Sequence, residues 1–308
     1  MLTRRQTLAG AVSFVAAPRA FAQVISKPAQ MIVGFAAGGG TDVSARLFAE
    51  RLRGLYAPNV VVENKVGAGG RLGNELVKNA PTDGSVIPFT PDFTLTIFAV
   101  IYKNLSYDPV KDLIAVAPVT KGALVFSVGP QVPSSVTTVK GFLDWAKANP
   151  EKANYATTGA GGTPHFSGVM LAKTSGVPLT AVHYRGGAPA LQDLVGGHIA
   201  SSFNPSSEAI PLAEGGKLRI LAQVVSEKSR FLPNTPTMRE AGYDVAIDTW
   251  TGILLPAKTP EPIVSGLSSA VEKMAKMPDL IEAQARSEEH TSELQSLAYL
   301  VCRLLLEK

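Results

Sequence analysis

The chain is poor in residues that form disulfide bonds, metal sites and reactive centres. Its 308 residues include one cysteine, Cys302, and four histidines. A single cysteine excludes an internal disulfide bond. His165, His183 and His198 do not share the close spacing, with an acid nearby, that is typical of metal-binding histidines. We therefore expect no metal site and no internal disulfide bond.

Motifs of two common enzyme classes are also absent. The chain has no G-x-S-x-G sequence and so lacks the nucleophile turn of one large class of serine hydrolases. It has no G-x-x-x-x-G-K-[ST] sequence either, which excludes a P-loop. The formal net charge is +4, and Arg4, Arg5 and Arg19 supply three of these charges. The remainder is nearly neutral without a basic cluster, which argues against nucleic acid as a partner.

Only one hydrophobic run stands out, and it lies at the N-terminus. Residues 3–8 (TRRQTL) resemble a twin-arginine export signal, residues 8–17 are apolar, and Ala20 and Ala22 form a small-x-small cleavage site. The run is shorter than the roughly 20 apolar residues that span a bilayer. We predict that residues 1–22 are an export signal peptide and that the mature protein is periplasmic. A retained membrane anchor is the alternative.

The residues that are present favour an α/β fold. Residues 31–55 (MIVGFAAGGGTDVSARLFAERLRGL) predict an apolar strand, a glycine turn and an amphipathic helix. Gly38, Gly39 and Gly40 allow the chain to turn tightly. Thr41 is the expected N-cap of the helix, and Asp42 suits its positive first turn.

A second strand, glycine turn and helix mirror the first. Residues 153–157 predict the strand and residues 158–165 (TGAGGTPH) the turn, and Pro164 suits the start of the following helix. Free N–H groups at a helix start form an anion site. Strands and helices alternate along the chain, so we expect mostly parallel sheets, with ligands beyond the carboxyl ends of their strands. Two interpretations stay open: the turns hold a ligand carboxylate, or they only reverse the chain.

A third glycine-rich turn gives a weak nucleotide-binding signal. Gly67, Gly69 and Gly73 match a variant of the dinucleotide fingerprint, but Leu72 occupies the position where G-x-G-x-x-G requires glycine. An exported α/β oxidoreductase that uses residues 67–73 for a cofactor is therefore an alternative function.

Several short segments carry a family resemblance. They are residues 34–42 (GFAAGGGTD), 61–70 (VVENKVGAGG), 105–109 (LSYDP), 155–159 (YATTG), 183–186 (HYRG), 216–219 (GKLR), 232–237 (LPNTPT) and 256–257 (PA). Together, and in this order, they resemble the Bug-type receptors, which are the extracytoplasmic solute-binding proteins of tripartite tricarboxylate transporters. Val66 departs from the usual proline of the family, and Ala200 from its frequent aspartate.

The resemblance implies a two-lobe, periplasmic-binding-protein-like (type II) α/β fold with the ligand in the cleft between lobes. On this basis we expect residues 23–122 and 226–285 to form lobe 1 and residues 123–225 to form lobe 2. It implies a receptor without enzymatic activity or cofactor, which captures a small carboxylate for membrane permease subunits. The carboxylate would be a di- or tricarboxylic acid, an acidic amino acid or an aromatic acid. We expect a monomer.

The candidate ligand-binding residues lie on the glycine turns and on two further segments of the second lobe. They are Phe35, Gly38, Gly39, Gly40, Thr41, Asp42, Thr158, Gly159, Gly161, Gly162, Thr163, His165, Tyr184, Arg185, Gly186 and Asn204. Arg185 is a candidate carboxylate clamp or a surface ion-pair partner. Asp42 is expected to orient its loop. A ligand-sensing subunit of a signalling system is a further alternative to a transport receptor.

The C-terminal segment departs from the pattern of the family. Residues 286–296 (RSEEHTSELQS) are what a common sequencing-adapter sequence encodes. We therefore interpret residues 286–308 as a non-native tail, and expect lobe 1 to be incomplete at its C-terminus and less stable for that reason. A natural amphipathic terminal helix is the alternative, because Leu294, Leu297, Leu300 and Val301 have helical spacing.

Overall fold

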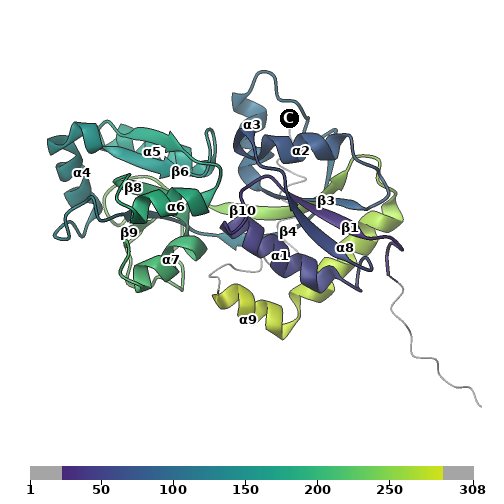
Figure 1. Ribbon diagram of the computed structural model, residues 1–308. Helices are drawn as coiled ribbons and strands as arrows, with labels where there is room; N and C mark the ends of the chain where they lie inside the picture. The colour runs from purple at the N-terminus through teal and green to yellow at the C-terminus, as the bar shows by residue number, and fades with distance from the viewer. Residues whose placement is uncertain (1–22, 287–308) are drawn as a thin grey trace, which may run out of the picture.

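A computed structural model describes residues 23–286, so the predicted signal peptide and residues 287–308 of the predicted tail lie outside the described residues. The described chain forms two lobes, each built on a five-stranded sheet with helices packed against it (Figure 1). The predicted two-lobe α/β fold is confirmed. Within residues 23–286, no helix is long and apolar enough to cross a membrane.

The first lobe contains the sheet β2-β1-β3-β10-β4. Its strands are β1 (Ala29–Val33), β2 (Val60–Asn64), β3 (Val86–Pro91), β4 (Leu113–Gly122) and β10 (Thr249–Pro256). Strand β1 pairs in parallel with β2 and β3, whereas β10 runs antiparallel to both β3 and β4. Its helices are α1 (Gly40–Leu52), α2 (Arg71–Lys78), α3 (Ile97–Ile101), α8 (Glu261–Ala275) and α9 (Pro278–Arg286), with 3-10 turns at Ala68–Gly70 and Asp92–Thr94.

The second lobe contains the sheet β7-β6-β8-β5-β9. Its strands are β5 (Leu124–Val128), β6 (Asn154–Thr157), β7 (Thr180–His183), β8 (Ser201–Pro205) and β9 (Arg219–Gln223). Strand β6 pairs in parallel with β7 and β8, and β5 runs antiparallel to β8 and β9. Its helices are α4 (Val139–Ala148), α5 (Thr163–Ser175), α6 (Gly187–Val195) and α7 (Ser206–Glu214), with a 3-10 turn at Pro150–Lys152.

Two passages of the chain connect the lobes, one from β4 to β5 and one from β9 to β10 (Figure 1). The second passage follows the second lobe for most of its length. Met238 and Val245, in the stretch that the sequence prediction placed in lobe 1, are fully buried in the core of the second sheet. The backbone of Gln223 pairs with the chain at Thr237, which holds this stretch in place.

Each sheet covers its own hydrophobic core, and the helix patterns explain how. In α1 the residues Ala45, Phe48, Ala49 and Leu52 recur at helical spacing and are buried against the first sheet. In the core of the second lobe, the ring of Phe126 packs against the rings of Phe142 and Phe203. Separate cores are typical of lobes that can move relative to each other as rigid bodies.

Candidate functional site

A cavity of about 70 Å³ lies between the two lobes, at the ends of β3 and β4, at the start of β10 and at the starts of α1, α5 and α6. Aromatic rings of Phe35, Phe93 and Trp250 form part of its wall, and backbone and hydroxyl groups form much of the rest. We call it the cleft cavity. Seven of the predicted binding residues line it: Phe35, Gly39, Gly40, Thr41, Thr158, Thr163 and Gly186. Lining residues that the sequence analysis missed include Phe93, Thr120, Gly187 and Glu208.

The first glycine turn makes hydrogen bonds with groups of the protein itself. The N–H of Gly38 donates to Asp42 Oδ2 at 2.9 Å, and the N–H of Gly39 donates to the carbonyl of Ala36 at 3.4 Å. The N–H of Gly40 donates to Oε1 of Glu208, in the other lobe, at 2.6 Å. These three amides are therefore already engaged in the described structure.

The side chain of Asp42 fixes the conformation of the first glycine turn. Its side chain is buried and accepts hydrogen bonds from Arg46 and Asn64 as well as from Gly38. Burial alone would raise the pKa of Asp42, but these hydrogen bonds outweigh it and the pKa lies below its usual value. Asp42 is thus a carboxylate that fixes the loop, the role that the sequence analysis preferred.

The expected N-cap at Thr41 is wrong. Helix α1 begins at Gly40 with Gly39 as its N-cap, and no side chain from the turn caps it. Glu208 lies 168 residues away in sequence and supplies the acceptor at the helix start instead. The prediction was wrong because it considered only side chains close in sequence to the helix start. Here the acceptor comes from the other lobe.

The second glycine turn contributes the start of α5 to the wall of the cleft cavity. Helix α5 begins at Thr163 with Gly162 as its N-cap, and Pro164 lies in the first turn as predicted. Within residues 23–286, no acceptor is assigned to the amides of Gly162 and Thr163. Thr163 is only 2% exposed and lines the cavity. Unpaired N–H groups at this helix start are suited to an anionic group.

His165 does not line the cleft cavity. It instead contacts the backbone of the second glycine turn. Its Nδ1 accepts the N–H of Gly161 at 3.1 Å, and its ring packs edge-on against His183 with centroids 4.7 Å apart. Burial, and then the neighbouring His183, lowers the pKa of His165, while burial lowers the pKa of His183. Both imidazoles are therefore favoured in the neutral form.

The remaining second-lobe candidates also lie outside the cleft cavity. The hydroxyl of Tyr184 donates to Asp193 Oδ2 at 2.7 Å. Arg185 is exposed, and its carbonyl accepts the N–H of Ala36 at 3.1 Å across the two lobes. Asn204 is fully buried, and its Nδ2 lies 3.5 Å from Oε2 of Glu208. These contacts position backbone and neighbouring side chains.

The third glycine-rich turn has a packing role. An ideal Cβ on Gly34 would lie 2.7 Å from Cα of Gly70, and one on Gly73 would lie 3.2 Å from Cα of Gly34. These glycines let the end of β1 approach the start of α2. Gly34 and Gly70 border a further cavity of about 220 Å³, which Gly159, Tyr184 and Arg185 also line. No group of three or more potential metal ligands occurs within residues 23–286.

Nothing in the sequence around Glu208 indicates that its side chain lines the cleft cavity. It lies in the first turn of α7, where an acidic residue is common because it complements the helix dipole. Only the packing of the lobes brings its carboxylate to the start of α1, and burial raises its pKa to about 7 despite hydrogen bonds from Gly40 and Asn204.

The sequence matches the family model described as the tripartite tricarboxylate transporter family receptor over residues 44–301. The chain belongs to this family of solute-binding receptors. The resemblance to Bug-type receptors is thereby confirmed.

Named relatives and solved structures agree with this assignment. BugT of Bordetella pertussis is 28% identical over 277 residues, covering 89% of this chain and 84% of the relative. MatC of Rhodopseudomonas palustris, solved with bound malate, has 29% identity and a TM-score of 0.83, with 91% and 96% of the two chains covered. A second R. palustris protein, solved with adipate, has 26% identity and a TM-score of 0.84, with 91% and 93% covered.

Proposed function

We propose that this protein is a periplasmic receptor that binds a small carboxylate in the cleft cavity and delivers it to the membrane permease of a tripartite tricarboxylate transporter. The observation that carries the proposal is the start of α5, where the buried Thr163 lines a cavity shared by both lobes and its amide has no acceptor among the described residues. A carboxylate oxygen accepts such N–H groups readily, and the positive end of the helix dipole adds to the attraction.

Contacts between the lobes support capture by closure. Besides the bond between Ala36 and Arg185, an ideal Cβ on Gly162 would lie 3.2 Å from the ring of Phe93 in the other lobe. The α5 turn and the aromatic wall therefore meet only when the lobes are together. Because Phe93 and Gly162 come from different lobes, separation would open the cavity to solvent and release the ligand.

The similar receptors support a carboxylate as the ligand, and the N-terminal sequence supports a periplasmic location. Malate and adipate, in the two R. palustris structures, are both carboxylates. The predicted signal in residues 1–22 would export the receptor to the side of the membrane on which such proteins meet their ligands.

A thermal-shift screen of organic acids and amino acids tests the proposal, with isothermal titration calorimetry on each hit. We expect Gly162→Leu to weaken binding of a hit by at least about tenfold, because the new side chain would meet Phe93 and hold the lobes apart. Gly215→Ala, at the end of α7 and away from the cavity, is the control and should leave affinity unchanged. Wild-type affinity in Gly162→Leu would place the ligand elsewhere. Turnover of the ligand to a product would overturn the receptor function.

A further inference from the structure

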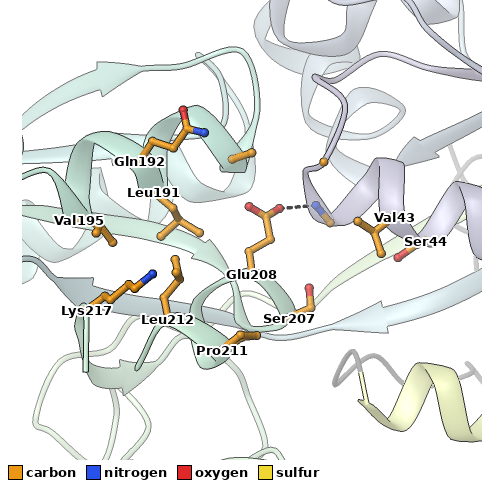
Figure 2. Close-up of a pocket in the computed structure, with 13 residues that line it drawn as sticks. Val43, Ser44, Leu191, Gln192, Val195, Ser207, Glu208, Pro211, Leu212 and Lys217 are labelled. Carbon is orange, nitrogen blue, oxygen red and sulfur yellow. Dashed lines mark hydrogen bonds between the residues drawn. The ribbon is translucent and has the colours of Figure 1, made fainter. Parts of the chain in front are cut away.

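The carboxylate of Glu208 packs closely against main-chain atoms of both lobes. Figure 2 shows its hydrogen bond with the start of α1. Its Oε1 accepts the N–H of Gly40, and an ideal Cβ on Gly40 would lie only 3.0 Å from that oxygen. On the opposite side, an ideal Cβ on Gly187 would lie 1.7 Å from Oε2. Only glycine, which has no Cβ, permits so close an approach of the backbone to the carboxylate. The starts of α1 and α6 thus form the binding position of this carboxylate, which we call the seat of Glu208.

Several groups around this side chain stabilise its charged form and oppose the effect of burial. The starts of α1 and α6 face it, and Glu208 itself belongs to the first turn of α7. The positive ends of three helix dipoles therefore meet at one carboxylate. The side-chain amide of Asn204 approaches Oε2 as well, at 3.5 Å. Burial outweighs these contacts and raises the pKa of Glu208 to about 7, so the side chain is fully charged only above neutral pH.

Glu208 also separates two cavities. On one side lies the cleft cavity, and on the other an outer groove of about 460 Å³ between α1, α6 and α7. The groove has apolar walls that include Val43, Leu191 and Leu212, and Lys217 lies at its far end (Figure 2). Glu208 is the wall of the cleft cavity on this side, so a ligand in the cavity meets its carboxylate.

Two consequences follow for a ligand held at α5. The first glycine turn cannot hold a second ligand carboxylate with the amide of Gly40, because Glu208 already accepts that N–H. Above the pKa of Glu208, a second carboxylate in the cavity would also face a charge of the same sign. At about 6 Å and an effective dielectric constant of about 20, two such charges repel enough to weaken binding on the order of 100-fold. An ammonium group there would instead gain a charge-assisted hydrogen bond.

We infer that Glu208 determines ligand selectivity: the cleft accepts an acid with one carboxylate, whose far end carries an ammonium group or another hydrogen-bond donor, and disfavours dicarboxylates. In this arrangement the start of α5 binds the ligand carboxylate, and Glu208 accepts from the donor at the far end. The inference rests on the proposed receptor function and narrows its ligand class to amino and hydroxy monocarboxylic acids.

Matched pairs of ligands test it by calorimetry at about pH 8, above the pKa of Glu208. β-Alanine and succinate share two methylene groups and one carboxylate, and differ only in the group at the other end. 4-Aminobutyrate and glutarate form the same pair with three methylene groups. We expect the wild type to prefer the amino acid in at least one pair by about tenfold or more. In Glu208→Gln, which keeps the size of the side chain, this preference should fall by at least about tenfold.

Glu214→Gln is the matched control, because Glu214 is an exposed acid on the same helix. It should retain the wild-type preference. Glu208→Ala gives a second variant with the charge removed, and should lose the preference as Glu208→Gln does. A wild type that prefers the diacid, or an unchanged preference in both Glu208 variants, would overturn the inference. Failure of the wild type to bind any carboxylate in the wider screen would instead overturn the proposed receptor function itself.

Discussion

Replacing Gly187 by alanine tests the seat of Glu208 through stability alone. Gly187 is the first residue of α6 and has no positive φ, so alanine fits its backbone. The new Cβ would lie 1.7 Å from Oε2 of Glu208, far inside any real contact distance. Since a glutamate side chain is flexible, we expect it to swing away and to give up its hydrogen bond with Gly40.

The net effect can be estimated from two opposing terms. Loss of a hydrogen bond to a charged group costs about 1.5–3 kcal/mol. Alanine gains up to about 1 kcal/mol over glycine in helix propensity. We therefore expect Gly187→Ala to lower the free energy of unfolding by about 0.5–2 kcal/mol. For a chain of this size that corresponds to a fall in melting temperature of about 1–8 °C.

A double-mutant cycle measured by chemical denaturation separates the two terms. In a Glu208→Ala background there is no carboxylate to displace, so Gly187→Ala should be neutral or stabilising by up to about 1 kcal/mol. The coupling between the two positions is then about 2 kcal/mol. Equal destabilisation by Gly187→Ala in both backgrounds would show that the carboxylate does not occupy this seat.

Three further predictions concern stability. Thr41→Ala should change the free energy of unfolding by less than about 0.5 kcal/mol, because Thr41 is not the N-cap; a loss of about 1 kcal/mol in denaturant melts would contradict the observed helix start. Gly168→Ala should cost about 1–3 kcal/mol, because its Cβ would lie 2.1 Å from the buried ring of Tyr155, and an unchanged melt would argue against that packing. The pKa of Glu208 is raised from 4.5 to about 7, so the folded state holds the proton more tightly and wild-type stability falls as pH rises through this window. The melting temperature of Glu208→Gln relative to wild type should accordingly increase from about pH 5 to about pH 8, and a constant difference would refute the shift.

Local patterns in the sequence determined the main elements of the fold. The apolar strand, glycine turn and amphipathic helix of residues 31–55 correspond to β1 and α1, and residues 153–175 correspond to β6 and α5. These patterns are readable because each depends on residues within a few positions of one another. Pro164 in the first turn of α5 is an example, since its missing N–H suits that position wherever the helix lies.

The sequence by itself therefore determined the α/β class, the two glycine turns and, through its family resemblance, the kind of receptor. Only the tertiary structure decided how the amides of the first turn are used. The acceptor for Gly40 comes from Glu208, across the cleft and 168 residues away, where its own neighbourhood shows nothing but an ordinary helix start. Phe93 and Trp250 likewise reach the cavity only because β3 and β10 are paired in one sheet. Contacts between distant segments depend on how whole lobes pack, and no local pattern of residues carries that information.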